Sequence, residues 1–183
     1  MKRRIVSITA LTIIVCFSSY VSAEPVNWNA IEVNDIEYYM QTDKSVYESG
    51  EDVEMLFRVT NLGTETVTFM FGGSPEWNFW VEQNDDPVWQ AVEGWYTQIV
   101  WLTLDSSEYK EYPYLWDMRD SEDILVGYGE YNVIGGFDAG TSLDNRMWEF
   151  TEVAVPVTII PEPSSLAIFI AGLSILAKKN KHA

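Results

Sequence analysis

The feature that most constrains the fold is an apolar side chain at every second position of several short segments. In residues 53–60 the odd positions are Val, Met, Phe and Val, and the even positions are Glu, Leu, Arg and Thr. Because successive side chains of a strand point to opposite faces, this pattern predicts a half-buried strand that ends at Asn61. Ile36, Tyr38 and Met40 alternate in the same way and predict the first strand of the domain.

The same period of two recurs at short intervals along the chain. Further strands are predicted at residues 66–71, 78–82, 87–90, 99–104, 109–116, 129–136 and 146–159. Turn-forming residues separate them, as at Gly72–Pro75 and Gln83–Asp86. Short strands with turns every 8 to 12 residues indicate a sandwich or a barrel, and we expect an all-β, immunoglobulin-like antiparallel β-sandwich.

The sequence also suggests what fills such a sandwich. All eight tryptophans lie beyond residue 27, and each aromatic ring can bury on the order of 150–250 Å². We expect Val59, Phe69, Val81 and Trp89 in the core, and we expect the side chain of Asn61 to close the turn that follows its strand.

The N-terminus is typical of a secretory signal. Three basic residues at positions 2–4 precede an apolar run to Phe17, and small residues occupy positions 21–23. We predict a signal peptide at residues 1–23, cleaved between Ala23 and Glu24. An uncleaved membrane anchor is the alternative, but the run is shorter than the roughly 20 residues that span a bilayer.

The C-terminus predicts a second sorting segment, residues 161–183. Pro161, Glu162 and Pro163 precede an apolar stretch over residues 166–177 and a lysine-rich end. A helix of that length covers only about 18 Å, which favours a transient membrane helix over a permanent anchor. The arrangement resembles the PEP-CTERM sorting signal, which implies processing by an exosortase. We therefore expect export across the inner membrane to the cell surface or extracellular matrix.

The composition of the segment between these ends excludes several functions. Residues 24–162 hold all 28 acidic residues and only five basic ones, a net charge of −23. This charge repels nucleic acid, which needs clustered Lys and Arg. Cys16 and His182 lie outside the segment, so disulfides, Ser-His-Asp or Cys-His catalysis and the usual zinc sites are excluded there.

We therefore expect no cofactor and no enzymatic activity. A carboxylate-based enzyme is the remaining catalytic alternative. The acidic stretch at residues 117–123 lacks the alternating ligand pattern of a calcium loop and is interpreted as solvated.

One family resemblance covers most of the predicted domain, residues 24–160. The residues that carry it are Tyr47–Val53, Val59–Asn61, Val67–Phe69, Asn78–Val81, Val88–Trp89, Tyr96–Gln98, Leu102–Leu104 and Trp116–Asp117. Together they resemble the BsuPI family, named for an intracellular proteinase inhibitor with an immunoglobulin-like sandwich. The turn before Trp89, the turn at residues 106–108 and the loop at 120–128 depart from its pattern. The resemblance implies a protease as the partner.

A single loop, residues 91–98, is the predicted contact surface. Glu93, Gly94, Trp95 and Tyr96 combine a flexible glycine with two adjacent aromatics, which are enriched in binding hot spots. An inward fold of these aromatics as a cap on the core is the alternative. Two functions follow. One is a non-catalytic module that binds a protease or another extracellular protein. The other is a structural or adhesive component of an exopolysaccharide matrix, in which aromatic faces stack on sugars.

Overall fold

The computed structural model describes residues 26–72, 75–92, 98–141 and 149–162, and every helix or strand assigned in these ranges is a strand. The strands are β1 (Asn27–Val33), β2 (Ile36–Thr42), β3 (Val46–Glu48), β4 (Val53–Asn61), β5 (Val67–Gly72), β6 (Asn78–Gln83), β7 (Asp86–Gln90), β8 (Ile99–Leu104), β9 (Tyr109–Trp116), β10 (Gly129–Thr141) and β11 (Glu149–Ile160). The predicted all-β class is confirmed. None of these ranges holds a helix long and apolar enough to cross a membrane.

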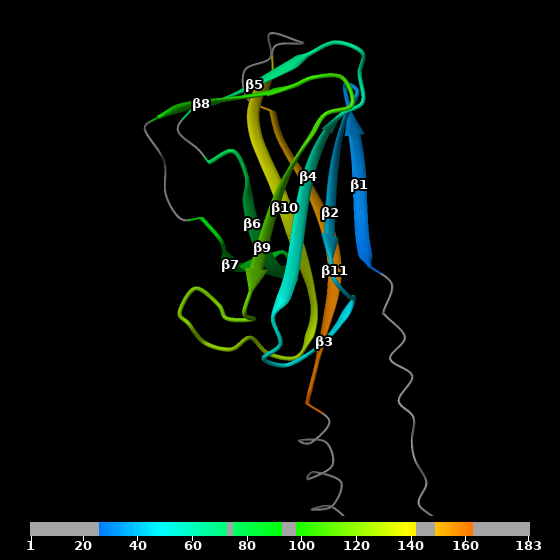
Figure 1. Ribbon diagram of the computed structural model, residues 1–183. Coiled ribbons are helices and arrows are strands. Elements are labelled where there is room, and N and C mark those ends of the chain that lie inside the picture. The colour runs from blue at the N-terminus through cyan, green and yellow to red at the C-terminus, as the bar shows by residue number, and fades with distance from the viewer. Residues whose placement is uncertain (1–25, 73–74, 93–97, 142–148, 163–183) are drawn as a thin grey trace, which may run out of the picture.

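The strands form two layers that face each other, as a β-sandwich requires (Figure 1). The first sheet has the order β1-β2-β4-β9 and is antiparallel throughout. The second has the order β3-β11-β10-β5-β8, with β6 and β7 as a side branch on β10. This branch arises because β10 is long enough to pair with β6 through residues 132–136 and with β5 through residues 140–141. The immunoglobulin-like variety of the sandwich stays a prediction.

Alternation along the strands places one face of each in the core. Every second residue of β2 and β4 is buried, from Ile36 to Thr42 and from Val53 to Asn61. The predicted core residues Val59, Phe69 and Val81 are fully buried. Trp89 is only partly buried, because it lies on the short outer strand β7 and packs sideways against Tyr114 and Trp116.

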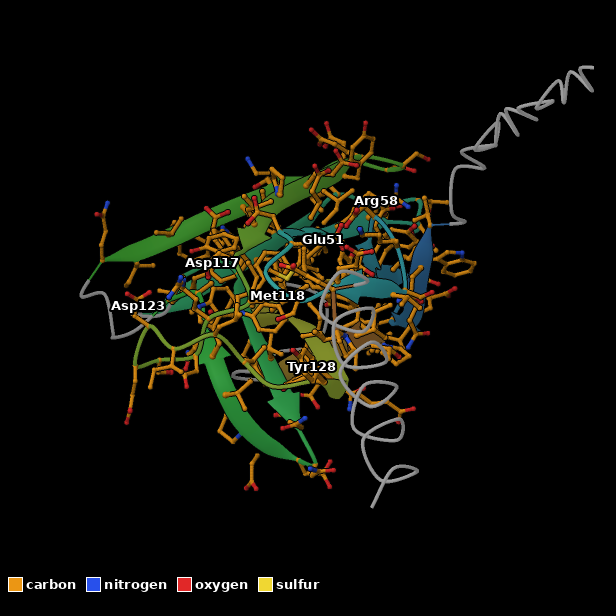
Figure 2. The ribbon with its side chains drawn as sticks, turned by 90° about the horizontal axis from the view of Figure 1, so that it is seen from below. Glu51, Arg58, Asp117, Met118, Asp123 and Tyr128 are labelled. Atoms are coloured by element: carbon orange, nitrogen blue, oxygen red, sulfur yellow. The ribbon has the colours of Figure 1, made fainter. Side chains whose placement is uncertain are left out.

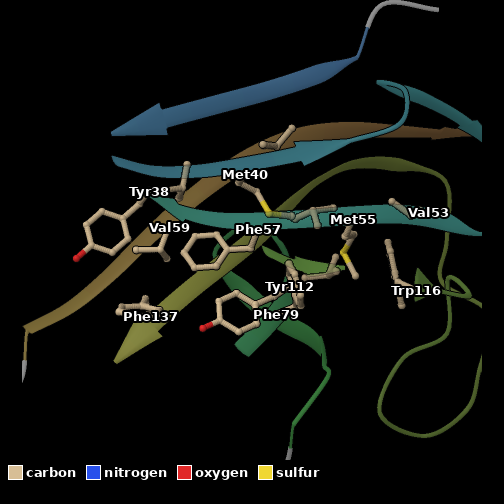
Figure 3. Close-up of a cluster of buried hydrophobic side chains, with 14 of the residues drawn as sticks. Tyr38, Met40, Val53, Met55, Phe57, Val59, Phe79, Tyr112, Trp116 and Phe137 are labelled. Atoms are coloured by element: carbon tan, nitrogen blue, oxygen red, sulfur yellow. The ribbon is translucent and has the colours of Figure 1, made fainter. Parts of the chain in front are cut away.

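The centre of the core is a cluster of aromatic rings (Figure 3). Phe57 of β4 lies 6.4 Å from Phe137 of β10 and 6.5 Å from Tyr112 of β9, centroid to centroid. Phe137 in turn makes edge contacts with Phe69 and Phe71 of β5 at 5.1 and 5.0 Å. The rings therefore join both sheets, and their burial stabilises the contact between them.

Strand β1 was not anticipated from the alternation. Its exposure pattern does not repeat every second residue, because it is an edge strand with little of its surface in the core. The signal that could have revealed it is the Asn34-Asp35 pair, which joins β1 to β2 with positive φ angles of 53° and 62°. Two such residues are typical of the tight turn of a β-hairpin.

Asn61 closes the turn after β4, as predicted. Its amide nitrogen donates to the carbonyl oxygens of Glu65 and Leu104 at 2.8 and 3.0 Å, and its Oδ1 accepts from the backbone N–H of Gly63 at 3.0 Å. The side chain is fully buried, so these three bonds replace the hydration that it loses. It ties the end of β4 to the end of β8.

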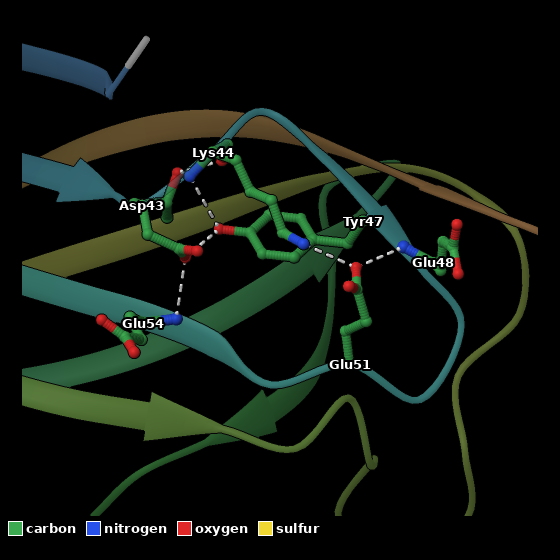
Figure 4. Close-up of polar contacts among 7 residues, drawn as sticks. Asp43, Lys44, Tyr47, Glu48, Glu51 and Glu54 are labelled. Carbon is green, nitrogen blue, oxygen red and sulfur yellow. Dashed lines mark hydrogen bonds and ion pairs between the residues drawn. The ribbon is translucent and has the colours of Figure 1, made fainter. Parts of the chain in front are cut away.

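The Tyr47–Val53 segment is fixed by a second polar network (Figure 4). The buried Tyr47 hydroxyl donates to Asp43 Oδ1 at 2.6 Å. Glu51 Oε2 accepts from Lys44 Nζ and from the backbone N–H of Glu48, both at 2.7 Å. Gly50 has a φ of +86°, which glycine adopts readily, and lies in the turn between Glu48 and Glu51. These residues, which carry part of the BsuPI resemblance, therefore position the chain between β3 and β4.

The described chain begins and ends at the same end of the sandwich. Asn27 pairs with Thr42, which pairs with Met55 near the start of β4, and Ile160 pairs with Glu48 just before that start. Figure 2 looks at this end, where the turn with Glu51 and the loop of residues 117–128 lie. Pro161 and Glu162, two of the predicted processing residues, follow β11 there. We call this the exit end.

Candidate functional site

A groove of about 540 Å³ lies on the open side of the sandwich, between the outer strands of the two sheets. Its walls come from Glu76 and Trp77 before β6, from Gln98 and Val100 at the start of β8, and from residues 110–113 of β9. Its volume falls in the range of about 300–1,000 Å³ that is usual for binding pockets. The groove is the candidate site.

The apolar wall of the groove is an extension of the aromatic core. The Trp77 ring lies 5.9 Å from Tyr112 and 5.3 Å from Phe79, which is itself fully buried. Rings held from behind in this way lose little conformational freedom when a ligand contacts them. The wall is therefore a rigid surface for an apolar or cationic side chain.

The polar wall is organised by one hydrogen bond. Tyr112 Oη donates to Glu76 Oε2 at 2.9 Å. Burial raises the pKa of Tyr112 well above its usual range, and the bond to the Glu76 carboxylate raises it further. The phenol therefore stays protonated and acts as a donor, not as a general base. Lys110 Nζ lies 5.9 Å from the centroid of the Tyr112 ring, and Glu111 adds a second carboxylate.

The predicted contact residues Glu93, Gly94, Trp95 and Tyr96 lie outside the described residues, so their role stays a prediction. The two ends of their loop are described. Val92 N–H donates to Asn78 Oδ1 at 3.2 Å, and both Val92 and Gln98 line the groove. Of the processing residues, Ala23, Glu24 and Pro163 also lie outside the described part of the chain.

Of the groove residues, the sequence singled out only Val92 and Gln98, which belong to the predicted contact loop of residues 91–98. Glu76, Trp77, Lys110 and Tyr112 show no sequence motif that marks them as a site. The pairing of Glu76 with Tyr112 joins positions 36 residues apart. No local pattern carries such a contact, so only the packing of β9 against the 75–77 segment could reveal it.

The acidic loop after β9 holds itself together by internal bonds. Arg119 lies 3.6 Å from both Asp117 and Asp123, and Asp120 Oδ1 accepts from the backbone N–H groups of Glu122 and Ile124, each at 2.9 Å. Among the described residues, no three or more His, Cys, Asp or Glu side chains gather in a way that could hold a metal ion.

A second surface of interest is a row of side chains across the outer face of the first sheet, formed by Trp28, Tyr39, Arg58 and Tyr109. Trp28 stacks on Tyr39 at 5.7 Å, and the Arg58 guanidinium lies 4.6 Å from the Tyr39 centroid and 5.9 Å from that of Tyr109. Glu37 pairs with Arg58 at 3.4 Å. The row crosses all four strands, and Trp28 remains 60% exposed.

Comparison with known protein families shows which family the chain belongs to, which the geometry alone does not show. Residues 40–139 match the family described as BsuPI, intracellular proteinase inhibitor. The chain belongs to the BsuPI family. The matched region runs from the middle of β2 to two residues before the end of β10, and it includes every residue named above for the groove.

Two strands of this BsuPI protein lie outside the matched region, and they contact each other. Asn27 and Asn29 of β1 donate to the carbonyl oxygens of Pro156 and Ala154 of β11, at 2.6 and 3.0 Å. β1 thereby closes the side of the sandwich opposite the groove. The two strands that flank the BsuPI region in the sequence therefore meet on one side of the sandwich.

Several solved structures resemble the fold at low identity. Spo0M, a sporulation control protein from Bacillus subtilis, is 14% identical over 77% of this chain and 56% of its own, with a TM-score of 0.42. The β-glucosidase EmGH1 from Erythrobacter marinus is 12% identical over 74% and 16%, with a TM-score of 0.35. The CARDB domain of PF1109 from Pyrococcus furiosus is 15% identical over 77% and 99%, at 0.35. The chain thus spans only 16% of the β-glucosidase and about half of Spo0M. No curated protein matches the sequence.

Proposed function

We propose that this chain is an exported, non-catalytic, proteinase-inhibitor-like module that binds a protein through the groove and the adjoining loop of residues 91–98. The observation that carries the proposal is the BsuPI match, which spans residues 40–139 and with them the whole groove. The family description names a proteinase inhibitor, so the proposed partner is a protease.

The chemistry of the groove supports binding in preference to catalysis. The Glu76 carboxylate accepts from a phenol whose pKa is raised by burial, and rigid rings form the remaining wall. The sequence has neither cysteine nor histidine between residues 24 and 162, which removes the common nucleophile–base pairs. Such a surface can recognise a side chain without activating one.

Export and orientation complete the proposal. The signal peptide at residues 1–23 and the sorting segment at 161–183, which resembles the PEP-CTERM signal, would deliver the domain across the inner membrane. The described chain both starts and stops at the exit end. Val53 at the start of β4 lies at the exit end. Lys110 of the groove pairs with Val59, which lies near the opposite end of β4. Residues 166–177 therefore follow the exit end in the chain, whereas Lys110 lies towards the other end of β4.

The test of inhibition uses the purified, processed protein with a panel of subtilisin-type serine proteases. We expect peptidase activity to fall as the protein approaches equimolar concentration. The exposed groove residue Glu111 provides a variant, Glu111→Lys, that should weaken inhibition by roughly tenfold if the groove contributes to the contact. Glu32→Lys, at an exposed position of β1, is the matched control. Full protease activity at large molar excess of folded protein overturns the inhibitor proposal.

Export is tested separately by mass spectrometry of the product recovered from producing cells. We expect an N-terminus at Glu24 and a C-terminus close to Pro161–Pro163. Recovery of the chain with both Met1 and Ala183 in place contradicts processing at either end.

A second candidate function, a structural or adhesive role in an exopolysaccharide matrix, is favoured by the exposed Trp28 ring and its stack on Tyr39. Flat aromatic faces on a sheet suit contact with sugar rings. A pull-down with the polysaccharide of the producing cells tests it, with Trp28→Ala as the variant and Trp101→Ala as an equally exposed control. Recovery of no protein excludes sugar binding.

A further inference from the structure

The two sheets leave several strand edges without a neighbouring strand among the described residues, and each edge presents backbone N–H and C=O groups that another strand could pair with. Such edges promote association between chains, so proteins usually protect them with proline, inward charges, short length or a covering segment. The edges are β1 and β9 in the first sheet and β3, β7 and β8 in the second.

Four of these edges carry protection that the structure shows directly. β9 holds Pro113 and places Lys110 at a core-facing position of its alternation. β7 contains Pro87, and the backbone N–H of Ser121 donates to its Val88 carbonyl at 3.1 Å. β3 has only three residues, and β1 carries the charged side chain of Glu32.

β8 has none of these devices. Its six residues, Ile99–Leu104, include no charge and no proline. All six pair with β5 on one side, and no described strand pairs with the other side. Ile99 and Trp101 are 58% and 63% exposed, although large apolar side chains at an edge favour contact with another chain.

The groove lies beside this strand. Val100 of β8 and Gln98 just before it line the groove together with Trp77 and Tyr112. A strand added along β8 would direct alternate side chains towards that groove, since side chains alternate between faces. Main-chain bonds then supply affinity, and the groove supplies specificity.

Charge selects the kind of segment that can pair. The chain carries a net charge of −17, and its 28 acidic residues all lie in the exported part, so two copies repel each other. The charged side chains that line the groove are Glu76, Glu111 and Lys110, so carboxylates outnumber ammonium groups there, and the Trp77 ring adds an aromatic face; this combination favours a cationic side chain. A second copy of this acidic chain is therefore a poor occupant and a basic segment a good one.

We propose that the free edge of β8 is a strand-addition site that receives an extended, cationic segment of a partner protein. Its side chains enter the groove beside Trp77 and Glu76. This inference rests on the protein-binding role proposed above and names the partner chemistry and the recognition mode.

The test uses the processed protein labelled with ¹⁵N and a short peptide that alternates lysine and valine. We expect amide shifts and slowed hydrogen exchange in residues 99–104 on addition of the peptide. A peptide of the same sequence with alternate backbone amides methylated cannot pair with a strand and should leave these signals unchanged. A peptide that alternates glutamate and valine should also fail. Shifts at another strand instead, or equal binding of the methylated peptide, overturn the proposal.

Trp101→Lys is the variant that protects the edge, and it should weaken peptide binding by roughly tenfold. Trp28→Lys adds the same charge at an equally exposed tryptophan on the other sheet and should leave binding unchanged. If Trp101→Lys does not fold by circular dichroism, Thr103→Lys at the next exposed position of β8 replaces it.

If the amides of residues 99–104 exchange slowly without peptide and the protein is a dimer in analytical ultracentrifugation, the edge pairs with a second copy of this chain. This result overturns the proposal of a cationic partner. The peptide and protease tests separate the two proposals. Peptide binding at β8 without inhibition of any protease removes the inhibitor role and keeps the strand-addition site. If the protein inhibits a protease equally well with and without Trp101→Lys and does not bind the peptide, the inhibitor role is kept and the strand-addition site is removed.

Discussion

Gly135 of β10 lies directly against the ring of Phe57 of β4. A Cβ atom built on Gly135 would stand 2.5 Å from Cδ2 of Phe57 and 3.0 Å from Sδ of Met40. The two sheets approach so closely here that no side chain fits between them, and the aromatic cluster of the core depends on this approach.

Gly135→Ala is therefore expected to destabilise the protein by about 1–3 kcal/mol, the usual cost of overpacking a close-packed core. Urea unfolding followed by tryptophan fluorescence measures the change. Gly127→Ala is the matched control, because its nearest atom would be Tyr131 Oη at 3.9 Å. If both variants unfold at the same urea concentration, β10 does not pack as closely against β4 as described.

Asn61→Ala should cost about 2–4 kcal/mol, because it leaves the carbonyl oxygens of Glu65 and Leu104 and the N–H of Gly63 without their partner. Thermal or urea unfolding provides the measurement. Asn132→Ala, at an exposed position of β10, should change stability by less than about 0.5 kcal/mol. A loss no larger than that of the control would mean that the Asn61 side chain is not the tie between β4 and β8.

Glu51 should make stability depend on acid pH. Burial tends to raise its pKa, but the hydrogen bonds from Lys44 and from the Glu48 N–H outweigh that effect and lower it. Its stabilisation is therefore complete above the unfolded pKa, about 4.3, and is lost as pH falls through the lower folded value. The side chain is partly exposed, so the effect is reduced by solvent.

The measurement compares urea midpoints of the protein and of Glu51→Gln from neutral to acid pH. The difference between them should be present at neutral pH and should shrink as the pH falls below about 4. Glu32→Gln serves as the control for the general effect of removing one charge. A difference that grows on acidification would contradict the assigned direction of the pKa.

Tyr112 should contribute to instability in alkali. Burial and the bond to Glu76 raise its pKa in the folded protein, so the unfolded chain loses this proton first. The stabilisation is present below about pH 10 and is lost as the pH rises above it. Tyr112→Phe should therefore flatten the alkaline fall of the urea midpoint, at a cost of about 0.5–1.5 kcal/mol near neutral pH for the lost hydrogen bond.

Tyr109→Phe, at an exposed position of the same strand, should leave the alkaline fall unchanged. Absorbance at the tyrosinate band gives an independent check. In Tyr112→Phe, the number of tyrosines that ionise only at high pH should be smaller by one. An unchanged alkaline slope in Tyr112→Phe would show that Tyr112 is not held by Glu76 in the folded protein.

The sequence by itself determined the class of the fold and all of its described strands except β1 and β3. Period-two alternation located β2, β4, β5 and β9 because burial of one face repeats along a strand whatever its neighbours are. Asn61 was predictable for a similar reason, since its bond to Gly63 N–H is local to the turn. The residues of the BsuPI resemblance were also visible in the chain, and Tyr47–Val53 proved to contain the turn from β3 to β4, which Glu51 holds.

The tertiary structure alone decided which strands lie at an edge and which residues meet across the sandwich. Trp101 and Trp116 both lie on edge strands, but Trp101 is exposed, whereas Trp116 is buried against Trp89 and Tyr131 from distant parts of the chain. The groove exists because β9 and the 75–77 segment bring Tyr112 to Glu76. Side-chain periodicity fixes the face of a strand, but sites of this kind depend on pairing between strands distant in sequence, and that pairing is settled only when the core packs.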